Sequence, residues 1–272
     1  MDVMMKPLAF GGAAVGIVVL AAIGAGWASA DNGSLPTTDL KREAASGQAG
    51  AAYTLGMRYY DVDGHKPDYK KAAHWLTVAA KAGDARAQAQ LAYLYQEGYG
   101  VSRDYAFARH WAGQAAAQGD GSAMDLLGDL YLHGLGVKRD YVTARSWFEK
   151  SAAKGNSAGQ ANLGWIYFYG LGVPKDCKRA VGDYRDSIRQ SDPSGENNLA
   201  VAYFFGCGVP QNNTASLKWA LIADRSITAK PGLLTEGNKA RIARNIVNLE
   251  QRMTASEIAT AKDEAAKWKP GD

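Results

Sequence analysis

The feature of this chain that most constrains its fold is a leucine that recurs every 36 residues. A tyrosine follows each leucine after four residues, without insertion or deletion across five copies. The leucines are Leu55, Leu91, Leu127, Leu163 and Leu199, and the tyrosines are Tyr59, Tyr95, Tyr131, Tyr167 and Tyr203. A fixed period of this length predicts a repeat array in which one small unit stacks on its neighbours. The pattern predicts the kind of surface that the protein builds, but not the molecule that binds to it.

Each unit is predicted to be a pair of helices. Small residues lie four positions before and one position after each leucine, as Ala123 and Gly128 do around Leu127. These positions share one side of a helix with 3.6 residues per turn, and small side chains there let a second helix approach closely. A turn such as Gly134-Leu-Gly136 then ends the first helix, because glycine adopts the positive φ that closes a helix.

The second helix of each unit is predicted to begin after an Asp or Asn at one fixed repeat position. Such side chains are preferred N-caps because their oxygen accepts a hydrogen bond from an amide in the first turn. The positions are Asp68, Asp104, Asp140, Asp176 and Asn212. A tryptophan follows along this helix in the other units, but Asp183 replaces it in the fourth unit, where Ser191 also replaces the closing glycine. The second helix of the fourth unit therefore fits the pattern least well.

The combined pattern resembles the Sel1-like repeat, a relative of the tetratricopeptide repeat. The match is best in residues 123–155 and covers about residues 48–223, and Thr254 and Glu257 have the capping-box spacing of a closing helix common in that family. The resemblance implies an all-α fold, a right-handed α-α superhelical solenoid of five repeats. It implies a lead-in over residues 31–47, the repeats over residues 48–223 and a C-terminal helical cap over residues 224–272.

The N-terminal region has the pattern of an export signal. Residues 7–30 carry no charged side chain, Lys6 precedes them, and Ala28-Ser-Ala30 is a small-residue cleavage motif. This arrangement predicts a secretory signal peptide over residues 1–30, cleaved before Asp31. The alternative is an uncleaved membrane anchor, since the apolar stretch is long enough to cross a bilayer. Both alternatives put the repeats outside the cytoplasm, and the family resemblance favours the bacterial periplasm.

The chain has two cysteines, Cys177 and Cys207, which fall at the same edge of adjacent predicted units. An oxidising compartment favours a disulfide between them. Closing a loop of this size contributes on the order of 3–4 kcal/mol to stability. The alternative is two isolated thiols that lie too far apart to bridge.

The sequence predicts no catalytic residue, metal site or cofactor. Ser151 and Lys154 have the serine–lysine spacing of penicillin-recognising enzymes. A cell-wall-directed, β-lactamase-like enzyme or ligand-binder is therefore one alternative function, although alanine holds the position of Ser151 in earlier units and no Lys-Thr-Gly follows. His74 and His110 share a repeat position but lack a third metal ligand. With 31 basic and 27 acidic residues and no basic run, nucleic acid is not an expected partner.

A partner protein is expected to bind to a stripe on the first helices, at two, five and six positions after each leucine. The tetratricopeptide resemblance implies that these helices line the concave face. The stripe is strongly aromatic in the last two units, and aromatic side chains in a groove are typical of interface hot spots. The predicted partner-binding residues are Tyr60, Tyr93, Trp165, Phe168, Tyr169, Phe204 and Phe205. The alternative is that residues 224–272 cover these rings, since the end of a solenoid must be capped.

The expected function is that of a non-catalytic periplasmic scaffold or regulator. It would hold a peptide or helix of an envelope or sensor protein along the groove of the solenoid. A membrane-tethered envelope assembly factor is a further alternative, and the membrane is a partner only if the N-terminal segment is not cleaved.

Overall fold

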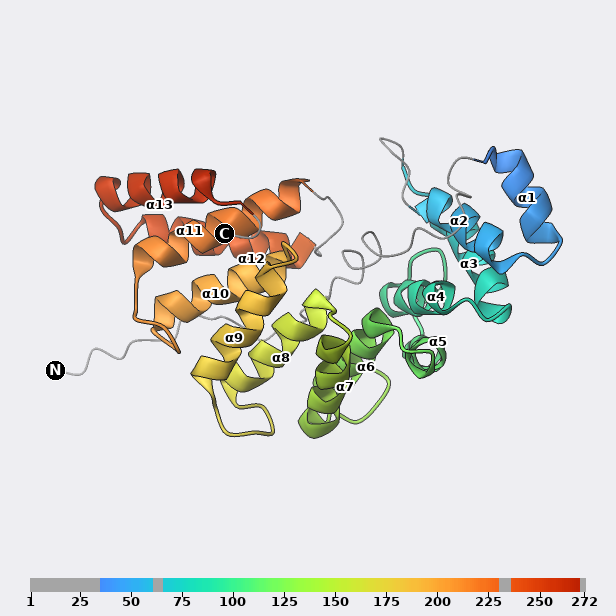
Figure 1. Cartoon of the computed structure of the whole chain (residues 1–272), viewed down its shortest axis with the longest axis horizontal. Helices are drawn as coiled ribbons and strands as arrows, with labels where there is room; N and C mark the ends of the chain where they lie inside the picture. Colours follow the sequence, from blue (N-terminus) through green and yellow to red (C-terminus); the bar gives the residue numbers. More distant parts are fainter. Residues whose placement is uncertain (1–34, 61–65, 230–235, 270–272) are drawn as a thin grey trace.

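The computed structural model describes residues 35–60, 66–229 and 236–269, and the predicted signal peptide lies outside them. This part of the chain forms thirteen α-helices and no strand. The helices follow one another along an arc from α1 to α13 (Figure 1). Among the described helices, none is long and apolar enough to cross a bilayer. The expected all-α solenoid is confirmed.

Five helix pairs form the array. The first helix of each pair belongs to an inner layer made of α2 (Ala49–Tyr60), α4 (Ala85–Glu97), α6 (Gly121–His133), α8 (Ser157–Tyr169) and α10 (Pro193–Phe205). The second helix belongs to an outer layer made of α3 (Tyr69–Lys81), α5 (Tyr105–Ala117), α7 (Tyr141–Ala153), α9 (Cys177–Ile188) and α11 (Asn213–Ala229). The array is preceded by α1 (Thr37–Ala45) and followed by α12 (Glu236–Glu250) and α13 (Ala255–Lys267).

The two layers differ in how closely their helices are spaced. Within each unit the two helices pack together, and each outer helix also packs on the inner helix of the next unit. Inner helices in addition touch one another, as α4 touches α6, α6 touches α8 and α8 touches α10. Across the described residues, successive outer helices make at most marginal contacts. The closer spacing of the inner layer curves the array, which Figure 1 shows as an arc.

Two series of N-caps fix where the helices begin. The predicted series caps the outer helices; Asp104 Oδ1, for example, accepts hydrogen bonds from the amides of Ala106 at 2.9 Å and Phe107 at 3.1 Å. A second series, which the sequence analysis missed, caps the inner helices; Asn156 Oδ1, for example, accepts from the amide of Gly159 at 2.8 Å. Its members are Asp84, Asp120, Asn156 and Asp192. From the second unit on, both helices of a unit therefore have a defined start.

Glycine occupies two kinds of position where a side chain would not fit. On the inner helices it allows close packing, since a Cβ on Gly164 would lie 2.6 Å from the ring of Tyr184 on the paired outer helix. In the turns, Gly134 ends α6 in the left-handed conformation at φ 68°. The second turn glycine, Gly136, has a φ of 63° and lies against Tyr105 at the start of the preceding outer helix. The predicted reason for the small residues is therefore confirmed.

The fourth unit keeps the repeat geometry despite its unusual residues. Tyr184 is 1% exposed and packs against Gly164, in the place that Phe148 takes opposite Gly128 one unit earlier. Asp183, which replaces the tryptophan, is only half-buried. Ser191 has a φ of 54° and adopts the left-handed conformation that glycine adopts in the preceding units. The core contact thus survives the substitution, at the cost of backbone strain at Ser191.

The C-terminal helices cover the end of the array. Both α12 and α13 pack on α11, as Figure 1 shows. Arg225 Nη1 on α11 donates a hydrogen bond to the carbonyl of Ala265 at 2.9 Å. The rings of Trp219 and Trp268 meet edge to face with centroids 5.7 Å apart. The predicted capping box of Thr254 and Glu257 is present at the start of α13.

Candidate protein-binding site

The predicted binding stripe is divided between the core and the surface. Tyr60, Tyr93 and Phe168 are buried, with exposed fractions of 7%, 8% and 4%. Phe168 faces the next inner helix, with its ring centroid 6.4 Å from that of Phe205. The ring of Tyr60 instead packs on Tyr69 at the start of the outer helix α3, with centroids 5.4 Å apart. These three side chains belong to the core, which corrects their predicted role in binding a partner.

The remaining aromatic residues of the fourth and fifth units reach the surface. Phe205 is 51% exposed, Tyr169 is 39% exposed and Trp165 is half-buried. The ring centroids of Trp165 and Tyr169 are 4.2 Å apart. The buried ring of Phe168 connects the group, with its centroid 4.9 Å from that of Tyr169 and 6.4 Å from that of Phe205. We call Trp165, Tyr169 and Phe205 the aromatic patch; it lies on the C-terminal halves of α8 and α10.

The C-terminal region covers one of the predicted residues. Phe204 is half-buried and packs against a cluster that includes Leu249 of α12, as does Ile246 of the same helix. A small apolar pocket lined by Phe204, Val201 and Leu249 lies between α10, α11 and α12. The helix α12 thus covers Phe204, whereas Trp165, Tyr169 and Phe205 keep an accessible surface.

A chain of buried polar side chains, which the sequence analysis missed, crosses the inner layer. Asn162 Nδ2 on α8 donates to Asp125 Oδ1 on α6 at 2.8 Å, and both side chains are buried. Gln96 Nε2 on α4 donates to Asp129 Oδ2 on α6 at 3.3 Å, and His133 Nε2 lies 3.1 Å from Asp129 Oδ1. Because buried polar groups need partners, these bonds fix how each inner helix sits against the next. The residues differ from unit to unit, which is why no repeat pattern revealed them.

Burial dominates the electrostatics of this chain of polar residues. It raises the pKa of Asp125 well above its usual value, against the hydrogen bond from Asn162, and it also raises the pKa of Asp129. Burial alone lowers the pKa of His133, but the hydrogen bond and charge of Asp129 outweigh it, so that the pKa is raised. The three groups therefore hold protons more tightly than they would in water.

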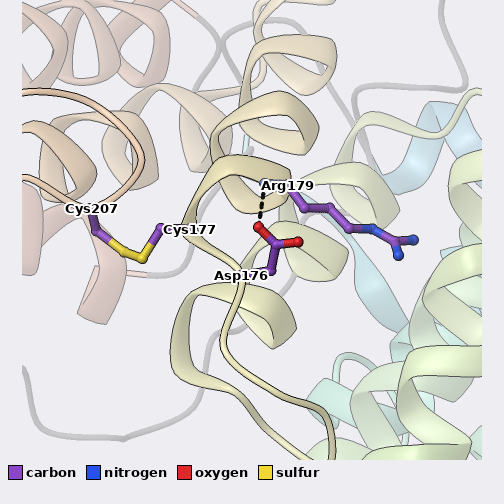
Figure 2. Close-up of a disulfide and its surroundings, with 4 residues drawn as sticks. All are labelled: Asp176, Cys177, Arg179 and Cys207. Atoms are coloured by element: carbon purple, nitrogen blue, oxygen red, sulfur yellow. Dashed lines mark hydrogen bonds between the residues drawn. A yellow bond between two sulfur atoms is a disulfide. The ribbon is translucent and has the colours of Figure 1, made fainter.

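The two cysteines form a disulfide at the junction of the fourth and fifth units. Cys177 begins α9, directly after its N-cap Asp176, and Cys207 lies in the turn after α10. Figure 2 shows the bridge beside Asp176, whose side chain accepts a hydrogen bond from the amide of Arg179 at 3.0 Å. The Cα atoms of the cysteines are 5.1 Å apart. At the equivalent positions of the first junction, the rings of Tyr69 and Tyr99 stack with centroids 4.8 Å apart.

The serine and the two histidines that were considered as catalytic or metal-binding residues contact neighbouring parts of the repeat framework. Ser151 is fully buried and its hydroxyl donates a hydrogen bond to the carbonyl of Gly121 at 2.7 Å. His74 and His110 are exposed, and each meets the neighbouring tryptophan edge to face. Within the described ranges, no three His, Cys, Asp or Glu side chains are arranged to hold a metal ion. The aromatic patch is the place on the inner helices where exposed aromatic side chains of adjacent units lie together.

Known structures with this architecture are repeat proteins. A Sel1 repeat protein from Oxalobacter formigenes is 28% identical, with a TM-score of 0.58 over 72% of this chain and 56% of that chain. A protective antigen of uropathogenic Escherichia coli with an SLR fold is 26% identical, with a TM-score of 0.52 over 88% and 65%. A Sel1 repeat protein from Klebsiella pneumoniae is 22% identical, with a TM-score of 0.53 over 79% and 100%. The chain thus spans less than two thirds of the length of the first two.

Sequence comparison identifies the same repeats. No curated protein matches the chain. The Sel1 repeat family model matches residues 49–84, 85–120, 121–156, 157–182 and 193–223. The fourth match stops just before Asp183, where the unit departs from the pattern. Since the five matches cover more than half of the chain, the protein belongs to the Sel1 repeat family.

Proposed function

We propose that this protein is a non-catalytic interaction scaffold or regulator that binds a segment of a partner protein at the aromatic patch. The Sel1 repeat scaffold is a fold typical of protein–protein interaction. The observation that carries the proposal is the exposure of Tyr169 and Phe205 on adjacent inner helices, with Trp165 beside them. Aromatic side chains that group on a rigid surface supply large contact area with little loss of conformational entropy, as interface hot spots do.

In the proposed mechanism, the partner segment binds through apolar contacts and complementary shape, and no covalent bond is made or broken. The helices that carry the patch are held by the core ring of Phe168 and by the disulfide at the same junction. A preorganised surface of this kind loses little entropy when a partner binds. The environment of Ser151 disfavours the β-lactamase-like alternative, because its buried hydroxyl donates to a backbone carbonyl and has no contact with solvent.

We further propose that the protein works in the periplasm. The signal-peptide pattern of residues 1–30 supports this location, and so does the disulfide, since such bonds persist in oxidising compartments. Mass spectrometry of the protein purified from its native cell tests the proposal. A mature N-terminus at Asp31 is the expected result, while an intact Met1 in the membrane fraction would favour the tethered form.

The binding proposal is tested by quantitative affinity capture from the native envelope fraction. The double variant with Trp165→Ala and Tyr169→Ala should lose the proteins that the wild type retains. Phe107→Ala is the matched control, because Phe107 is 51% exposed but lies on the outer helix α5. Equal capture by the wild type and the double variant, both folded by far-UV circular dichroism, would show that the patch is not the binding site.

A further inference from the structure

An arginine that acts on Tyr169 of the aromatic patch has no carboxylate partner among the described residues. Arg241 on α12 is half-buried, and its Nε atom is buried without a hydrogen-bond acceptor among the described residues. Burial lowers the pKa of Arg241, and in the described structure the other groups that act on it are Tyr169 and Arg244. A buried guanidinium N–H without an acceptor is unfavourable unless a partner supplies one.

The surroundings of the patch are positively charged as well. Lys175 Nζ lies 5.4 Å from the ring centroid of Phe168, which connects the patch, and Arg252 Cζ lies 5.8 Å from that of Phe204. Together with Arg241, these cations come from the turn after α8, the segment after α12 and α12 itself. A rim of positively charged side chains attracts an acidic partner and disfavours a basic one.

These observations define the chemistry of the occupant, and the inference rests on the proposed function of the patch. We propose that the patch and Arg241 together bind an acidic, apolar segment of a partner protein. An Asp or Glu carboxylate of the segment accepts hydrogen bonds from Arg241, whose planar guanidinium matches a carboxylate with two parallel bonds. A neighbouring aromatic or aliphatic side chain of the segment packs on Trp165 and Tyr169.

A protein segment fits this surface better than a nucleic acid does. Phosphate backbones are bound by rows of cations along a groove, whereas here three cations surround a compact aromatic surface. The net charge of the whole chain is only +4. Short oligothymidylate serves as the competitor that distinguishes the two classes of partner.

The test first selects peptides that bind to the protein and then removes the negative charge of their acidic residue. Random dodecapeptides displayed on phage are selected on the full chain in mild detergent. The enriched peptides are synthesised with their acidic residue as Glu and as Gln, and their affinities are measured by fluorescence anisotropy. We expect enrichment of Asp or Glu beside aromatic or aliphatic residues, and at least about tenfold weaker binding of the Gln peptides.

Variants of Arg241 test whether this side chain causes the preference for acidic peptides. Arg241→Gln should bind the Glu and Gln peptides alike, and Arg241→Lys should keep a preference for Glu because it keeps the charge. Arg244→Gln is the matched control, since Arg244 is exposed on the same helix, and it should behave like the wild type. Circular dichroism and thermal unfolding establish that each variant is folded.

The possible failures are distinguishable. Selected peptides without acidic enrichment, or an unchanged Glu preference in folded Arg241→Gln, would overturn the acidic specificity while leaving the patch a binding site. Displacement of the peptides by oligothymidylate at similar concentrations would overturn the choice of a protein partner. The absence of any selected peptide would contradict both this inference and the proposed function.

Discussion

Breaking the disulfide between Cys177 and Cys207 is expected to destabilise one end of the array selectively. The bridge joins the start of α9 to the turn after α10 and closes a loop with a sequence separation of 30 residues. In the chain-entropy model, a loop of this length in the unfolded chain gives about 3–4 kcal/mol of stabilisation. Since each unit of a solenoid contacts only its neighbours, the loss should be concentrated in the fourth and fifth units and the C-terminal helices.

The measurement compares the oxidised protein, the reduced protein and the double variant with Cys177→Ser and Cys207→Ser. Urea unfolding followed by circular dichroism gives the free energy of unfolding, and hydrogen exchange resolved by mass spectrometry locates the change. The protection of α10 and α11 should fall, whereas that of α2 to α5 should change little. The reducing agent should have no effect on the double serine variant.

A second variant distinguishes the stability contributed by the disulfide bond from that contributed by side-chain packing at the same two positions. The equivalent positions of the preceding junction are Tyr141 and Leu171, so Cys177→Tyr with Cys207→Leu installs the side chains that this array uses without a bridge. This variant should recover part of the lost stability. If reduction changes the free energy of unfolding by less than about 0.5 kcal/mol, or lowers protection evenly along the array, the reasoning from loop closure is refuted.

Three further substitutions test the packing, the backbone and the electrostatics. Gly164→Ala should destabilise the protein by about 1–3 kcal/mol in urea unfolding, because the new methyl group overlaps Tyr184; an unchanged midpoint would contradict this close packing. Ser191→Gly should stabilise it by about 1 kcal/mol, because it removes the strain of a positive φ; a lower melting temperature would contradict this. Burial raises the pKa of Asp183 to about 7 in the folded state, so its ionisation opposes folding and stability should fall as the pH rises from about 4 to 7. Asp183→Asn should flatten that profile and gain about 1–2 kcal/mol at pH 8, a figure reduced for the partial exposure of the side chain; an unaltered pH profile would contradict the shift.

The repeat period was enough to predict the helix pairs, the turns and the caps of the outer helices. These features depend on contacts that each unit makes with the same residue types, so that every copy repeats the signal. The Asp or Asn before the second to fifth inner helices carries a similarly regular signal, as Asp84 and Asp120 show, and it could have been found in the same way.

The binding stripe was predicted less well, for a physical reason. The periodicity of one helix shows which side is apolar, but not whether the opposite side meets solvent or a neighbouring unit. Inner helices here are packed on several sides, so Tyr93 and Phe168 are core residues. The buried pair of Asp125 and Asn162 looked variable because each junction of the inner layer uses different polar side chains for a similar contact.

Site-specific photo-crosslinking in the native cell tests whether a partner protein binds to the aromatic patch. A photoreactive phenylalanine derivative is placed at Tyr169 or Phe205 in the patch, and at Phe107 or Val142, which are 51% and 55% exposed on the outer helices. We expect crosslinks to the same protein from both patch positions and none to it from the outer positions. Crosslinks to that protein only from Phe107 or Val142, or equally from all four positions, would contradict the account.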